Sequence, residues 1–169
     1  SAVSVLRSLR EMKQEAVILA DLSTRMPAEG LDKAIRGLMD AFPETVGIME
    51  SRRGSLMSSQ ETRLSFVKVL RASGHGVLLD QGSGDHLVAE FADSGIPAVR
   101  VHSHLDRNDL NERTIRRFID AAAAHAATET SEPIVVLVRL RPTTIGAILR
   151  WYMENRPQEL AVVPLSQQF

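Results

Sequence analysis

Apolar and polar positions follow two different periods along the chain. Short continuous apolar runs, rich in Val and Ile, are typical of strands buried on both faces of a parallel sheet. Between these runs, apolar residues recur every three or four positions, as on one face of a helix. Strands are predicted at residues 16–20, 46–49, 77–79, 98–101 and 161–163, and in the run that opens at Pro133. Helices are predicted around the apolar faces Val5–Met12, Leu31–Phe42, Leu64–Leu70, Leu87–Phe91, Ile115–Ile119 and Ile145–Tyr152.

Strands and helices alternate with short connections, which predicts βα units. We therefore expect an α/β fold with a mostly parallel sheet or a partial barrel, in a single domain that spans residues 1–169. Ser58–Glu61 and Asp109–Glu112 have the pattern of capping boxes, and each is predicted to open a helix. His75 follows the helix-ending Gly74 and is predicted to lie at the surface.

The run that opens at Pro133 leads into two arginines. Arg139 and Arg141 are two residues apart, so both side chains point the same way off a strand end. Pro142 then favours a helix start, which Thr143 or Thr144 could cap. Since ligands of parallel sheets and barrels bind at the carboxyl ends of strands, the two arginines mark the predicted functional face. The alternative is that they are solvated or paired with nearby carboxylates.

Other polar residues also follow predicted strands, and these ends should converge on one face. They are Asp21, Glu50 with Arg52, Asp80, and the group His102, His104 and Asp106. Two imidazoles and a carboxylate are a credible zinc or iron set. Alternate residues on one strand spread over about 12 Å, however, so these three could share a metal only if the chain turns after His104. Loops are polar in any case, which is the simpler explanation of the whole set.

Composition excludes several classes of protein. The net charge of −1 gives no sign of nucleic-acid or membrane-surface binding, and no apolar run is long enough to span a bilayer. The absence of cysteine excludes disulfides, thiolate nucleophiles and cysteine-based zinc sites. The chain opens without Met, so we expect a trimmed product from which any leader has been removed.

Six stretches carry a resemblance through their order along the chain. They are Val46–Ser55, Leu78–Gln81, Gly95–Pro97, Leu105–Asn108, Val138–Thr144 and Val162–Ser166. From Pro27 to Phe169 this ordered set resembles the divergent polysaccharide deacetylase family, relatives of NodB-type carbohydrate deacetylases. The resemblance implies a deformed (β/α) barrel of NodB-like type. The family opens with a strand that carries Asp-Asp, whereas Asp21 here is followed by Leu22, so the first strand or strands are expected to be missing.

The resemblance also implies which site residues have changed. The two metal-site histidines of the family fall on Arg52 and Arg139, while Asp80 and Asp106 keep the catalytic positions as vestiges. A guanidinium has only donors and stays protonated, so it cannot ligate a metal. If the carboxylates stay buried without the metal, at least one of these arginines should form a salt bridge with Asp80 or Asp106.

Three hypotheses follow for function. The first is a catalytically degenerate module without a cofactor, periplasmic or secreted, which binds an anionic glycan or a protein partner. Its binding residues would be Arg52, Arg139, Arg141, Ser55, Glu50, His102 and His104. The second is an active carbohydrate deacetylase that holds zinc or another divalent metal in a rearranged site of His102, His104, Asp80 and Asp106. The third is an α/β enzyme that clamps a phosphorylated substrate with its arginines.

A last expectation concerns assembly. Missing strands would leave a sheet edge or a core face exposed, which is an aggregation liability. The simplest cover is a second copy of the chain, so a homodimer with two-fold symmetry is predicted.

Overall fold

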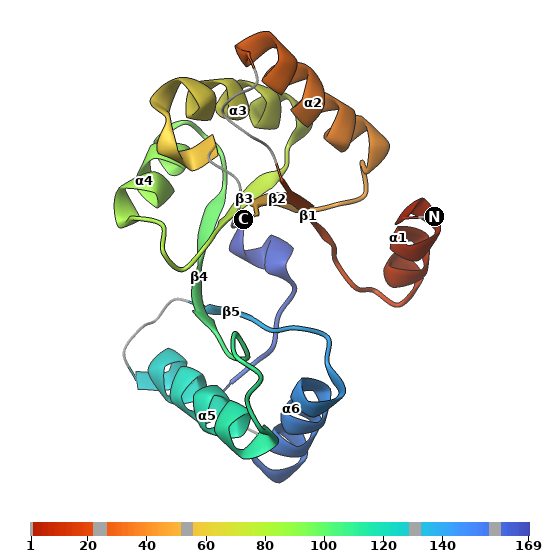
Figure 1. Ribbon diagram of the computed structural model, residues 1–169, viewed down its shortest axis with the longest axis vertical. Coiled ribbons are helices and arrows are strands. Elements are labelled where there is room, and N and C mark those ends of the chain that lie inside the picture. The colour runs from red at the N-terminus through yellow and green to blue at the C-terminus, as the bar shows by residue number, and fades with distance from the viewer. Residues whose placement is uncertain (1, 22–26, 52–55, 129–132, 156–159) are drawn as a thin grey trace. The chain divides into compact units, whose positions relative to one another are not determined.

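The computed structural model describes residues 2–21, 27–51, 56–128, 133–155 and 160–169 (Figure 1). The strands are β1 (Val17–Ala20), β2 (Gly47–Glu50), β3 (Gly76–Leu79), β4 (Ala98–His104) and β5 (Val135–Leu137). The helices are α1 (Ala2–Glu11), α2 (Ala28–Ala41), α3 (Gln60–Ser73), α4 (Asp85–Asp93), α5 (Glu112–Thr128) and α6 (Pro142–Asn155), with two short 3-10 helices, η1 (Leu56–Ser58) and η2 (Leu165–Gln168). The predicted α/β class is confirmed.

All strand pairs of the sheet are parallel, and the strand order is β1-β2-β3-β4-β5. A sequential order is the order of (β/α) barrels, whereas doubly wound sheets reverse direction at a switch point. The fold is therefore compatible with the deformed NodB-like barrel that the resemblance implies. The register of β4 against β5 shifts between Val101 and Ser103, so the end of β4 carries a bulge-like irregularity.

The chain divides into two compact units. The first comprises residues 1–100 and 164–169, and the second comprises residues 101–163. The boundary lies within β4, whose first residues pair with β3 and whose last residues pair with β5. That the whole chain acts as a single domain stays a prediction.

The core of the first unit lies between one face of its strands and the helices α2, α3 and α4. It contains Leu31, Ile35, Ile48, Phe66, Leu70, Val77, Leu79 and Phe91. All four residues of β3 are buried, as expected for a strand covered on both faces. The rings of Phe66 and Phe91 meet edge to face, with centroids 6.2 Å apart, which fixes α3 against α4.

The C-terminal segment of this unit packs against two glycines. A Cβ atom on Gly76, the first residue of β3, would lie 2.6 Å from ring carbons of Phe169. A Cβ atom on Gly47, the first residue of β2, would lie 3.0 Å from the same ring. The Glu15 carboxylate accepts hydrogen bonds from the backbone and the hydroxyl of Ser166. Glycine at both strand starts therefore makes room for the Phe169 ring.

His75, which was predicted to lie at the surface, is buried at the start of β3. Neither of its ring nitrogens has a hydrogen-bond partner among the described residues. Burial lowers the pKa of His75 because the charged imidazolium loses hydration there. The backbone of Ser73 acts in the opposite direction on the pKa of His75, and its effect is smaller than that of burial.

In the second unit, α5 and α6 pack together around Leu105, Ile115, Ile119 and Ala147. Three polar contacts join the two helices along their length. They are the ion pairs Arg116–Glu154 and Arg150–Glu112, and a hydrogen bond of 2.7 Å from Trp151 Nε1 to Asp120 Oδ1. The α5 residues are spaced by four, and their partners all lie between residues 150 and 154, so the contacts hold the last part of α6 against the first half of α5.

Several residues of the predicted apolar faces are exposed, Leu64 in α3 among them, and three wrong predictions concern the C-terminal part of the chain. Residues 161–163 form no strand, and Val162 is almost fully exposed. The strand after Pro133 is not buried on both faces, since Val136 in β5 is exposed. The predicted core face of α6, which contains Ile145 and Tyr152, is also exposed. In each case the local pattern is apolar, but no described neighbour covers it.

Two helix starts differ from the predicted capping boxes. At α5 the cap is Asn111, whose Oδ1 accepts hydrogen bonds from the backbone and the hydroxyl of Thr114. Asp109 does not cap this helix. At α3 the N-cap residue is Ser59, but its side chain forms no capping hydrogen bond, and its carbonyl instead accepts from the Thr62 hydroxyl.

Candidate functional site

The candidate residues that the structure describes lie at carboxyl ends of strands. Glu50 ends β2, Asp80 follows β3, His104 ends β4, and Arg139 lies two residues beyond β5. Arg52 and Ser55 lie outside the described residues. Asp80 belongs to the first unit and Asp106 to the second, so the expected convergence of these two residues on one face stays a prediction.

Asp106 is the best-defined part of the candidate site. It is 3% exposed, and its carboxylate accepts hydrogen bonds from the Arg139 backbone N–H at 3.0 Å (Oδ1) and 2.9 Å (Oδ2). The Thr144 hydroxyl, which is fully buried, donates to Oδ2 at 2.8 Å. Asp106 therefore joins the loop after β4 to the connection between β5 and α6, using neutral donors. We call this arrangement of Asp106, Arg139 N–H and Thr144 the Asp106 latch.

The helix start explains why a carboxylate is stable there. Pro142 is the first residue of α6, and the Arg141 carbonyl accepts the first helical hydrogen bond, from Ile145 N–H at 2.9 Å. Thr144 thus lies in the first turn and does not precede it as a cap. The N-terminal end of a helix carries partial positive charge, which stabilises a nearby carboxylate. Asp106 therefore contacts the first turn of α6 through the Thr144 hydroxyl, and neither predicted threonine precedes the helix as a cap.

The two arginines after β5 have different surroundings. The Arg141 guanidinium pairs with the exposed carboxylate of Asp109. Arg139 is exposed, and its guanidinium forms no ion pair with any residue in the described part of the chain. At least one of Arg52 and Arg139 was expected to form a salt bridge with Asp80 or Asp106, and Arg139 contacts Asp106 through its backbone N–H and not through its guanidinium. For Arg52 and Asp80 the prediction stays open.

The proposed metal set does not assemble. His102 in β4 stacks on His125 in α5, with ring centroids 4.4 Å apart and planes inclined by 22°. The Asp106 carboxylate points toward the donors of its latch. Among the described residues, no three His, Asp or Glu side chains lie close enough together to hold a metal ion. As described, His102, His104 and Asp106 therefore do not form a ligand set for a divalent metal, while the set of the second hypothesis, which adds Asp80 of the first unit, stays a prediction.

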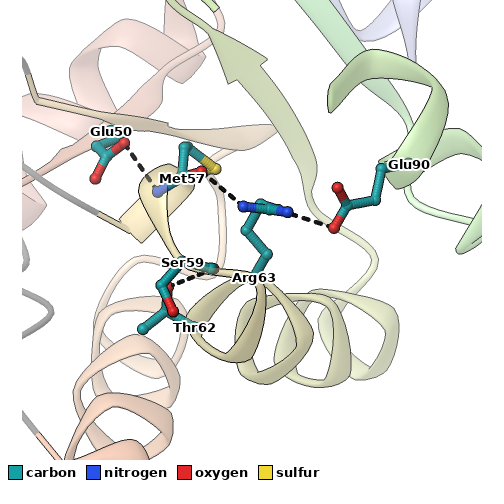
Figure 2. A network of polar contacts seen from close by, with 6 residues as sticks. All are labelled: Glu50, Met57, Ser59, Thr62, Arg63 and Glu90. Carbon is teal, nitrogen blue, oxygen red and sulfur yellow. Dashed lines mark hydrogen bonds and ion pairs between the residues drawn. The ribbon is translucent and has the colours of Figure 1, made fainter. Parts of the chain in front are cut away.

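Glu50 belongs to a network in the first unit that sequence reasoning missed (Figure 2). Its Oε2 accepts from the Met57 N–H at 3.3 Å, and the Met57 carbonyl accepts from Arg63 Nη1 at 2.8 Å. Arg63 Nε also contacts Glu90 Oε1 at 2.8 Å. Arg63, which is largely buried, thereby fixes η1 between the end of β2 and the helices α3 and α4. A lone arginine in a helix gives no sequence signal for this role.

The sequential parallel strands define an α/β protein whose sheet is compatible with a partial (β/α) barrel, with polar residues at the carboxyl ends of its strands. The sequence model of the divergent polysaccharide deacetylase family matches residues 13–169, so the chain belongs to that family.

A solved structure with the same fold is among the matches. It is the crystal structure of an uncharacterized protein from Agrobacterium tumefaciens C58, with a TM-score of 0.68 and 21% sequence identity. The match covers 85% of this chain and 57% of that chain, so this chain spans little more than half the length of its structural relative. No curated protein matches the sequence. None of the described helices is long and apolar enough to cross a membrane.

Proposed function

We propose that this chain is a catalytically degenerate member of its family, which binds an anionic glycan instead of deacetylating one. The Asp106 latch is the observation that carries the proposal. A carboxylate that ligated a metal or served as a base would need an accessible oxygen, but Asp106 is buried and already holds two protein donors. Its chemistry is that of a structural anchor.

The anionic character of the ligand follows from Arg139. Arg139 occupies the position at which the family resemblance places a histidine. Its side chain is exposed, and its backbone N–H is held by Asp106. A guanidinium recognises carboxylates and sulfates through paired N–H donors. Because its backbone is already fixed, Arg139 loses no further backbone freedom on binding, so the ordering cost is confined to its side chain.

Calorimetric titration tests the ligand class. A carboxylate-bearing oligosaccharide such as an oligogalacturonate should bind, a neutral chito-oligosaccharide should not, and added salt should weaken binding. Arg139→Ala should lower the affinity at least about tenfold. Arg117→Ala, which removes another exposed arginine of the same unit, should not. Equal binding of neutral and anionic sugars, or equal loss in both variants, would contradict the proposal.

An activity assay tests the degenerate state separately. The chain, incubated with zinc and then with acetylated chito-oligosaccharides, should release no acetate above the level of the free metal. Acetate release that Asp106→Asn abolishes would restore the deacetylase hypothesis. The proposal includes a periplasmic or secreted location, which rests on the family alone and is tested by fractionating cells that express the full gene.

A further inference from the structure

Helix α6 has a packed side and, adjacent to it, an exposed apolar side. One side carries Thr144, Ala147 and Trp151, which pack within the second unit. The other side carries a stripe of large apolar residues whose exposed fractions range from 36 to 75%. This stripe, named here the α6 stripe, consists of Ile145, Ile148, Leu149, Tyr152 and Met153.

The polar side of α6 is already occupied. Arg150 pairs with Glu112, and Glu154 pairs with Arg116, both on α5. The charged residues therefore face a neighbouring helix, while the apolar stripe faces outward. A helix that is apolar around most of its circumference is normally buried. The sequence pattern predicts that the stripe is buried, whereas the structure exposes it. An exposed apolar patch of this kind is typical of a surface that binds another polypeptide.

We infer that the α6 stripe is the contact between two copies of this chain, with α6 packed against its symmetry mate. Ile145, Ile148 and Tyr152 are spaced by three and then four residues, the spacing of a helix–helix seam. A large apolar side chain has an accessible area of roughly 150–250 Å². Multiplying such areas by the exposed fractions of the five stripe residues gives about 500 Å² of exposed surface in each copy. Two copies would then bury about 1,000 Å² in total, the lower limit of a specific interface. The inference goes beyond the proposed glycan binding and does not depend on it.

The charge of the chain is compatible with a second copy as the partner of the α6 stripe. The chain has a net charge of −1, so two copies repel each other only weakly. The stripe contains no charged residue, and a two-fold axis through it would bring like apolar side chains together. The stripe offers no charges that could complement those of a different partner. A two-fold contact between identical apolar surfaces does not need such complementarity.

Sedimentation velocity between roughly 1 and 100 μM tests this inference, because that range covers the micromolar dissociation constants of weak dimers. The wild-type chain should sediment as a dimer at the upper concentrations. Leu149→Glu should weaken dimerisation at least about tenfold. The matched control is Leu64→Glu on α3, since Leu64 is as exposed as Leu149 (59 and 58%) but lies outside the stripe. It should leave dimerisation unchanged.

A second measurement avoids any dependence on the folding of charged variants. The chain contains no cysteine, so a single Tyr152→Cys substitution provides a specific probe. Mild oxidation should convert most of this variant to a covalent dimer, and Leu64→Cys should stay largely monomeric. A wild-type chain that is monomeric at the highest concentration overturns the inference and leaves a different polypeptide as the occupant. A dimer that Leu149→Glu does not weaken, or equal cross-linking of both cysteine variants, overturns it as well.

Discussion

Removing the Thr144 hydroxyl tests the Asp106 latch most directly. Thr144→Val keeps the shape of the side chain, and the two residues have similar helix propensities, so the change isolates one hydrogen bond. The bond is fully buried at 2.8 Å and its acceptor is a carboxylate. Hydrogen bonds to charged groups contribute about 1.5–3 kcal/mol, and without this one Asp106 keeps only the shared N–H of Arg139. We expect the free energy of unfolding to fall by about that amount.

Urea denaturation of the full chain measures the loss. Thr143→Val is the matched control, because Thr143 occupies the same helical turn but is exposed. It should change the free energy of unfolding by no more than about 0.5 kcal/mol.

Asp106→Asn keeps an oxygen acceptor and removes the charge. In that background Thr144→Val should cost only about 0.5–1.5 kcal/mol, so the double-mutant cycle should show a coupling of about 1 kcal/mol.

Two results would refute this reasoning. If Thr144→Val and Thr143→Val lowered the free energy of unfolding equally, the buried Thr144 hydroxyl would stabilise the fold no more than the exposed Thr143 hydroxyl does. If the Thr144→Val and Asp106→Asn effects were additive, the charge of Asp106 would play no part in the bond. In either case Asp106 would be free for another role, and the main support for a degenerate site would be lost.

Short-range information in the sequence was sufficient for most of the fold. The runs at 16–20, 46–49 and 77–79 are apolar on both faces, and each became a strand with its ends shifted by at most one residue. The run at 161–163 is equally apolar but formed no strand. A strand also needs a neighbour to accept its backbone hydrogen bonds, and a sequence window of three residues does not specify that neighbour.

The site could be predicted only in part, because its contacts join distant residues. The family resemblance singled out Asp106, but its partners lie 33 and 38 residues further along the chain. Arg139 was selected for its guanidinium, whereas the structure uses its backbone N–H, a group that every residue except proline carries. Thr144 was interpreted as a helix cap because threonine is common there, and only the structure shows the buried carboxylate beside it.

Three further predictions concern stability, measured by urea unfolding. Gly76→Ala should cost about 1–3 kcal/mol, because its Cβ would meet the Phe169 ring at 2.6 Å, whereas Gly82→Ala, which points into open space, should be nearly neutral. A Phe169→Ala background should reduce the Gly76→Ala cost, and an unchanged cost would contradict the packing described. Asp109→Ala should lose at most about 1 kcal/mol, because its ion pair with Arg141 is exposed, and a larger loss would reveal a further role for this carboxylate. His75 should make stability depend on pH: because burial lowers the pKa of the folded imidazole below its ordinary value of 6.5, the unfolded chain binds the proton more readily. Its contribution to stability is therefore complete above pH 6.5 and is lost as the pH falls from there toward the lower pKa of the folded state. The wild-type chain should lose more stability than His75→Leu between about pH 7.5 and pH 5, and parallel curves for the two proteins would show that the buried ring does not resist protonation.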